Sequence, residues 1–141
     1  MRTLALISAL LCSPVLYAVQ VTEETPFARS VDETAALIDE CVASMNEVLS
    51  AYEGISDTQS ADAAAGRLRS LHARMQAAVD KVNSIGEADA ATQNLFMTKL
   101  LPMLFVNAAR TQTAFERIRQ NNYYGSEKLR HFMEEELQAQ G

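Results

Sequence analysis

Apolar residues recur every three or four positions along most of the chain after about residue 30, which is the period of α-helices that bury one face. The pattern is clearest between Ala61 and Ile85, where steps of three and four alternate without a break. This heptad-like spacing predicts a helix that packs knobs-into-holes against a neighbouring helix. Its apolar positions are Ala61, Ala64, Leu68, Leu71, Met75, Ala78, Val82 and Ile85.

A first helix is predicted upstream, beginning at Ser30 and ending at Gly54. Ser30 and Glu33 have the spacing of a capping box, and Gly54 can adopt the left-handed conformation that ends many helices. Ile55 supplies the apolar contact that often follows such an end, and we expect Gly86 to end the second helix in the same way. The predicted inner stripe of the first helix holds Val31, Ile38, Cys41, Met45, Val48 and Tyr52.

The longest helical pattern runs from Ala88 to about Asn122. Within it, residues 95–106 are apolar on nearly every side, and such a helix is either central in its own domain or covered by another molecule. Pro102 cannot donate a hydrogen bond to the carbonyl of Thr98, so we expect a kink or a short break near it. The predicted inner face comprises Met97, Leu101, Leu104, Ala108, Phe115 and Ile118.

Gly125 and Ser126 interrupt the pattern once more, and Ser126 is placed to cap a short last helix. The inner face of that helix is predicted to hold Leu129, Phe132, Met133 and Leu137. The whole pattern predicts an all-α fold, an up-down antiparallel bundle of three long helices plus a short C-terminal fourth helix, with the third helix kinked near Pro102. We expect a single domain over residues 30–140, preceded by a flexible lead-in over residues 19–29.

The first eighteen residues have the composition of a secretory signal peptide. Arg2 gives a positive start, residues 4–11 are apolar apart from one serine, and Ala18 is a small residue at a cleavage position. We therefore expect cleavage near Ala18 and a periplasmic or secreted mature chain. The stretch is too short to span a bilayer, so we expect no membrane insertion of the mature chain. Leu11 is not the small residue that lipid attachment at Cys12 would require.

Cys41 is then the one cysteine of the mature chain, so no intrachain disulfide is expected in it. Its place on the inner stripe of the first helix indicates a buried thiol that packs as a small hydrophobic residue. An intermolecular disulfide or a reactive thiol is the alternative.

The chain is acidic, with 12 Lys and Arg against 18 Asp and Glu and a net charge of −6. Removal of residues 1–18 takes away Arg2 and leaves 11 against 18, a net charge of −7. Nucleic acids and anionic lipid surfaces both require a basic footprint, so this balance argues against them as partners. The sequence also lacks Cys-x-x-Cys-His, a glycine-rich phosphate loop, His-Glu-x-x-His and Gly-x-Ser-x-Gly, so we predict no catalytic residues.

Two histidines are candidates for holding a metal or a haem iron. His72 and Met75 stand one turn apart on the second helix, although a core methionine beside a half-exposed histidine is the favoured interpretation. His131 has Glu127 four residues before it and Glu135 four after, whereas di-iron bundles use Glu-x-x-His. We therefore expect His131 on a solvated charged face, and we predict no metal and no cofactor.

The expected layout resembles that of soluble b-type cytochrome bundles, which are also secreted and of similar size. That resemblance implies haem held between a methionine near the start of the first helix and a histidine near the end of the last. Met45 and His131 are the nearest counterparts in this chain. Met45 stands too far along its helix and His131 is expected to point outward, so a haem- or metal-carrying bundle is kept as an alternative.

Residues 120–125 contain three amides and the aromatic pair Tyr123 and Tyr124, which can bind sugar or peptide, or can form a helix–helix turn with one tyrosine beneath it. The turn is favoured. The apolar excess at 95–106 instead indicates contact with another molecule, with Phe96, Met103 and Val106 as its candidate residues beside the two tyrosines. The hypothesis is a non-enzymatic interaction or structural module that binds a protein partner or a second copy. A small envelope chaperone is the second alternative.

Overall fold

The computed structural model describes residues 31–85 and 89–140, and within these ranges the chain forms helices and turns but no strand. The all-α fold class predicted from the sequence is confirmed. The predicted signal peptide over residues 1–18, the lead-in over residues 19–29, the Ser30 cap and the Gly86 stop lie outside the described residues. The elements are α3 (Val31–Glu53), α4 (Thr58–Asn83), α5 (Ala90–Leu95), the π-helical turn η1 (Phe96–Leu100), α6 (Leu101–Gln120), the short turn η2 (Asn122–Gly125), α7 (Glu127–His131), the π-helical turn η3 (Phe132–Glu136) and α8 (Leu137–Gln140).

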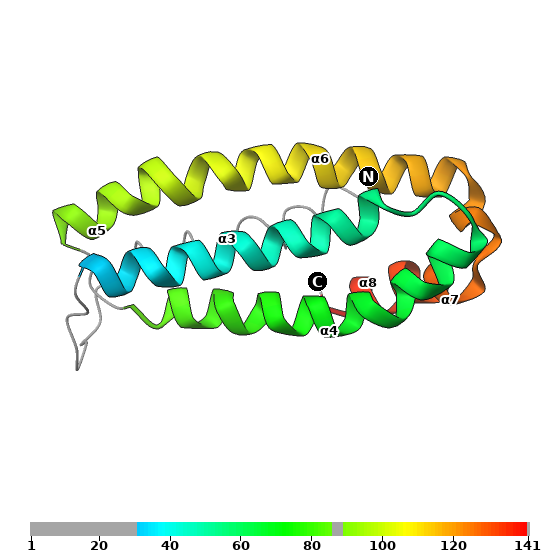
Figure 1. Cartoon of the computed structure of the whole chain (residues 1–141), viewed down its shortest axis with the longest axis horizontal. Coiled ribbons are helices and arrows are strands. Elements are labelled where there is room, and N and C mark those ends of the chain that lie inside the picture. Colours follow the sequence, from blue (N-terminus) through cyan, green and yellow to red (C-terminus); the bar gives the residue numbers. More distant parts are fainter. Residues whose placement is uncertain (1–30, 86–88, 141) are drawn as a thin grey trace.

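The long helices α3 and α4 and the α5–η1–α6 segment lie side by side along the long axis of the molecule (Figure 1). Ion pairs between the helices show in which direction each one runs. Going along α3, the paired residues come from earlier and earlier positions of α4, but from later and later positions of the η1–α6 segment. Helices α3 and α4 are therefore antiparallel. Exposed ion pairs of this kind contribute little stability, so the core must supply most of it. The pairs are Glu40–Lys81, Glu47–Arg74, Asp39–Lys99 and Glu53–Arg110.

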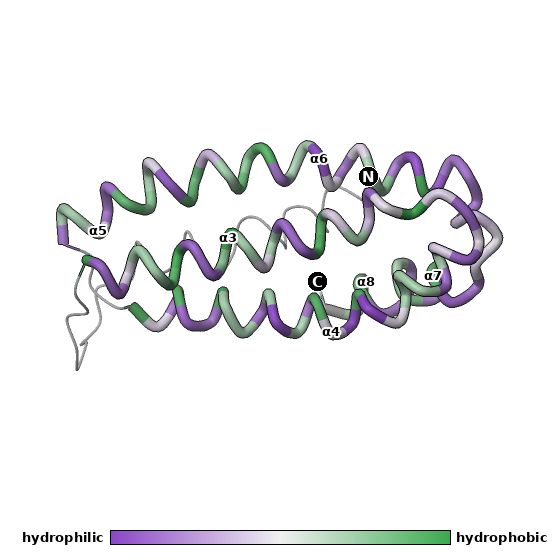
Figure 2. The backbone as a smooth tube through the Cα atoms, in the orientation of Figure 1, coloured by the Kyte–Doolittle hydropathy of each residue, from purple (hydrophilic) through white to green (hydrophobic). Residues whose placement is uncertain are grey.

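The eight apolar positions predicted from Ala61 to Ile85 are all buried. Seven of them lie on α4 and Ile85 follows its end, and Ala65, His72 and Val79 widen this buried stripe. The helix begins with a capping box in which the amide of Ser60 donates to the Asp57 carboxylate at 2.7 Å. The wider stripe lets α4 contact both α3 and the C-terminal segment. Figure 2 shows the alternation of apolar and polar residues along the helices.

Helix α3 buries its predicted stripe from Ile38 to Tyr52, but Val31 is 41% exposed because it stands at the first residue of the helix. The predicted left-handed conformation of Gly54 is wrong, since Gly125 is the glycine with positive φ in the described part of the chain. Arg117 of α6 satisfies the end of α3 instead, donating to the carbonyls of Tyr52 and Glu53 at 3.0 and 3.1 Å. A side chain from a neighbouring helix thus replaces the expected glycine cap.

The third helical segment contains a π-helical turn just before Pro102. The amide of Leu101 donates to the carbonyl of Phe96, five residues back, so one extra residue is accommodated in this turn. The buried positions are consequently Phe96, Leu100 and Leu104 rather than a set that includes Met97. The predicted inward position of Met97 is wrong because it requires an uninterrupted α-helix through the Phe96–Leu100 turn.

The C-terminal segment forms as the sequence predicts. Ser126 caps α7, and its hydroxyl accepts a hydrogen bond from the amide of Leu129 at 3.1 Å. The same hydroxyl donates to the carboxylate of Asp62 on α4 at 2.5 Å. The inner face of this segment is buried at Leu129, Phe132, Met133 and Leu137.

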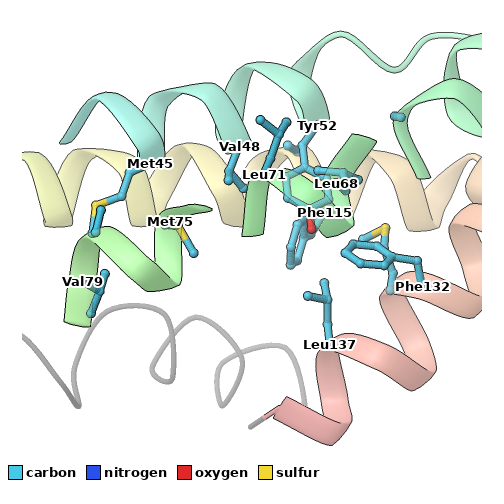
Figure 3. Packing of buried hydrophobic residues seen from close by; sticks show 14 of the residues in the cluster. Met45, Val48, Tyr52, Leu68, Leu71, Met75, Val79, Phe115, Phe132 and Leu137 are labelled. Atoms are coloured by element: carbon cyan, nitrogen blue, oxygen red, sulfur yellow. The ribbon is translucent and has the colours of Figure 1, made fainter. Parts of the chain in front are cut away.

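These elements share one hydrophobic core, of which Figure 3 shows the central part. Tyr52, Phe115 and Phe132 are among its largest fully buried side chains, and they come from α3, α6 and η3. In the portion of the chain that the structure describes, no helix combines the length and apolar character needed to cross a membrane.

Candidate interaction surface

Large apolar side chains meet solvent on the outer side of the third helical segment. Met97 is 59% exposed, Phe105 68% and Val106 51%. Pro102 and Ala109 are also exposed and continue the same side at helical spacing. We call these five residues the α6 outer face.

The helix itself explains why these residues point outward. Leu104 and Phe115 are buried against the core, which fixes the rotation of α6. Successive helical residues are separated by about 100°, so Phe105 and Val106 are turned away from the face that Leu104 buries. The π-helical turn rotates Met97 to the outside as well.

The α6 outer face is also free of charge. The chain from Ala90 to Phe115 contains no acidic residue, and its two basic residues pair with α3 instead of lying free. The Lys99 ammonium lies 3.6 Å from Asp39, and the Arg110 guanidinium makes bidentate hydrogen bonds of 2.7 and 3.0 Å with Glu53. An exposed apolar strip without charge is the usual character of an interaction site.

The five residues that the sequence predicts as an interaction surface differ in their exposure to solvent. Val106 is exposed, whereas Met103 and Tyr124 are half-buried. Phe96 and Tyr123 are buried, at 4% and 7% exposure, so the prediction is wrong for these two. The π-helical turn directs Phe96 inward, and Tyr123 packs beneath the turn that follows α6.

Sequence reasoning missed Phe105, which is more exposed than Met97 and Val106. A signal was present, because Phe105 directly follows Leu104 and must diverge from it on any helix. Met97 was missed for a different reason, since no pattern of spacing reveals a π-helical turn.

The turn over residues 122–125 is built for chain reversal. Asn122, Tyr123, Tyr124 and Gly125 all have positive φ, between 50° and 76°. The left-handed conformation costs about 1–2 kcal/mol for an ordinary residue, so other contacts must hold the turn. The Tyr123 hydroxyl donates to Glu134 at 2.7 Å, and the Thr58 hydroxyl donates to the carbonyl of Tyr124 at 2.5 Å. These bonds support the interpretation of the segment as a turn.

His72 forms a buried polar pair with Tyr52. Its Nε2 lies 2.8 Å from the Tyr52 hydroxyl, and its ring lies near Phe132, with ring centroids 5.7 Å apart. Burial lowers the pKa of His72 from 6.5 to about 4, and burial also raises the pKa of Tyr52. The expectation of a half-exposed His72 is wrong, because the buried stripe of α4 is wider than the apolar positions predicted from Ala61 to Ile85.

The candidate ligands for metal or haem lie in different surroundings. Met45 and Met75 are buried, and His72 already uses Nε2 in its bond with Tyr52. His131 is exposed and its Nδ1 lies 2.9 Å from Glu135, on the charged face expected for it. Within residues 31–85 and 89–140, no group of three His, Cys, Asp or Glu side chains is placed to hold a metal ion.

Cys41 is buried on the inner stripe of α3. Burial raises the pKa of its thiol from 9.0 to about 11, and the nearby charge of Glu40 adds to this effect. A thiol of this kind is protonated at neutral pH and reacts slowly.

A hollow lies between α3 and α4. Small side chains on α3 leave the space, and an arginine of α4 borders it. It is lined by Ala43, Asn46, Glu47, Ser50, Ala51 and Arg67. Because it holds no buried polar group and no large apolar side chain, the α6 outer face remains the stronger candidate site.

Comparison of the chain with protein-family models, with curated proteins and with solved structures finds no match.

Proposed function

We propose that this chain is an exported, non-enzymatic helical-bundle protein that binds another protein chain through the α6 outer face. The observation that carries the proposal is the exposure of Met97, Phe105 and Val106 on an uncharged helix side. Full burial of a side chain of this size stabilises by roughly 1.5–3 kcal/mol. Covering three of them supplies a substantial part of the free energy of a protein–protein contact.

Export is part of the proposal and rests on the first eighteen residues. Arg2, the apolar run that follows and Ala18 support a cleaved signal peptide. Cleavage would release a chain that begins near Val19 into the periplasm or the medium.

The scaffold we propose is an up-down antiparallel bundle with its third helix kinked near Pro102. The ion pairs between helices support this arrangement, since α4 is antiparallel to α3 and the α6 segment is parallel to α3. The π-helical turn η1 directly before Pro102 supports a local change of helix direction.

The two alternatives predict different behaviour. A haem or metal carrier would need His72 to give up its bond with Tyr52, or would need the exposed His131 as a ligand. A small envelope chaperone would use the α6 outer face for many unfolded chains, whereas a specific module binds one partner.

Site-specific photo-crosslinking in living cells tests the proposal. A photoreactive phenylalanine analogue replaces Phe105, and the matched control places it at Ala73, which is exposed on α4. We expect a discrete cross-linked product from position 105 and none from position 73. The absence of any product from position 105 would contradict the proposal, and a broad smear of products would favour the chaperone.

A further inference from the structure

We propose that the occupant of the α6 outer face is a second copy of this chain, packed antiparallel about a twofold axis between Phe105 and Val106. This inference rests on the proposed function and names its partner. Closed twofold pairs are the commonest form of self-association, and they require a surface that is complementary to itself.

Charge restricts the face on which two copies can meet. The chain carries a net charge of −6, so two copies repel one another across most of their surfaces. Exposed carboxylates occur on α3, α4 and the C-terminal segment, whereas the first on the third helical segment is Glu116, which follows the α6 outer face and accepts a hydrogen bond from Gln112 at 3.0 Å. Two copies that meet antiparallel on this face place Glu116 opposite Leu95, so no two acidic residues face each other.

The order of side chains along the helix is the argument for a second copy. In an antiparallel pair centred between Phe105 and Val106, Phe105 of one copy packs against Val106 of the other. Pro102 then faces Ala109, and Thr98 faces Thr113, so a larger side chain meets a smaller one near the centre and uncharged residues meet at the ends.

Orientation follows from the two basic residues of the segment. A parallel pair would place Lys99 against Lys99 and Arg110 against Arg110, with like charges facing each other. The antiparallel pair places Lys99 opposite Gln112 and Arg110 opposite Leu101. Both basic side chains also keep their ion pairs with α3. The antiparallel orientation avoids the repulsion.

Sedimentation equilibrium of the full chain, expressed and purified in the form the cell leaves it, tests this inference. We expect a monomer–dimer equilibrium, and we expect the double variant Phe105→Gln/Val106→Gln to weaken it at least tenfold. The matched control Ala73→Gln changes an exposed residue of α4 and should leave the equilibrium unchanged.

A thiol cross-link then tests the position of the axis. Val106→Cys places a thiol beside the proposed axis, and Ala73→Cys places one far from it. Both variants are made in a chain that starts at Val19 and so lacks Cys12, and the remaining native thiol, Cys41, is buried and does not compete. We expect a short bifunctional thiol reagent to join two Val106→Cys chains readily and Ala73→Cys chains hardly at all.

The outcomes separate the two proposals. A monomer at all concentrations, or equal cross-linking of the two cysteine variants, overturns the second copy as the occupant. If position 105 still cross-links to a different protein in cells, the proposed function stands without the dimer. If it cross-links to nothing, both proposals fail.

Discussion

The hydroxyl of Tyr52 lies 2.8 Å from Nε2 of His72, and this bond joins α3 to α4 inside the core. The Tyr52 ring also meets Phe115 edge-on, with centroids 4.7 Å apart, and His72 lies beside Phe132. Four elements thus converge on one polar pair among aromatic rings. Burial keeps Tyr52 a protonated phenol and His72 a neutral imidazole, so the bond joins two uncharged groups.

Stability should fall as the pH is lowered from about 6.5 toward 4. The pKa of His72 is lowered from 6.5 to about 4, so in this window the unfolded chain binds a proton that the folded chain excludes. The stability from a neutral His72 is therefore complete above pH 6.5, and up to about 3 kcal/mol is lost by pH 4. Urea unfolding at closely spaced pH values measures this loss.

The surrounding groups allow the effect to be assigned to His72. Tyr52 stays a neutral phenol, and the hydrogen bond from Arg69 lowers the pKa of Glu136 from 4.5, so the contribution of Glu136 begins to be lost only at the acid end of the His72 window. The pKa values of Asp57 and Asp89 are lowered by hydrogen bonds from 3.8, so their contributions are lost at lower pH than the His72 window. His72→Leu should flatten the dependence and the exposed-site control His131→Gln should keep it. An unchanged slope in His72→Leu would refute the assignment.

Tyr52→Phe should destabilise the protein through the partner it leaves behind. Removal of the hydroxyl leaves Nε2 of His72 buried without its bond, which costs about 1–3 kcal/mol. In the double variant with His72→Leu no polar group is stranded, so the two losses should not add. A double-mutant cycle by urea unfolding measures this coupling, and strict additivity would mean that the bond contributes nothing.

The fold was most predictable where the helix is uninterrupted. The spacing from Ala61 to Ile85 identified eight buried residues, seven of them on α4, because one helical period holds throughout that helix. The Ser126 cap was predictable because its chemistry is local to one turn. Long-range contacts were not predictable, since Tyr52 and His72 are twenty residues apart and nothing local links them.

The candidate surface was predictable only in outline. The excess of apolar residues at 95–106 indicated that one helix face would be left over. Which residues form that face depends on the π-helical turn, where the amide of Leu101 reaches the carbonyl of Phe96. This turn exchanges Phe96 and Met97 between the inside and the outside, and period alone does not show it.

Ser126→Ala should loosen the C-terminal segment. The hydroxyl caps α7 at the amide of Leu129 and also bonds to Asp62 of α4, so its removal should cost about 1–2 kcal/mol. Amide hydrogen exchange should rise most between Glu127 and Leu137. Ser70→Ala, at an exposed position within α4, is the matched control. It should change the free energy of unfolding by no more than a few tenths of a kcal/mol and should leave amide hydrogen exchange between Glu127 and Leu137 unchanged. Equal effects of the two variants would argue against the capping role.

The central claim is that the α6 outer face serves binding and not folding, and the free energy of unfolding of Phe105→Gln/Val106→Gln tests it most directly. Urea unfolding at a concentration where the protein is monomeric measures this free energy. Each of the two substitutions should change it by no more than about 0.5 kcal/mol relative to the unchanged chain. The adjacent control Leu104→Ala, at a residue only 4% exposed, should lose about 2–5 kcal/mol. A loss in the double variant as large as that of Leu104→Ala would show that these side chains belong to the core, and would contradict the account.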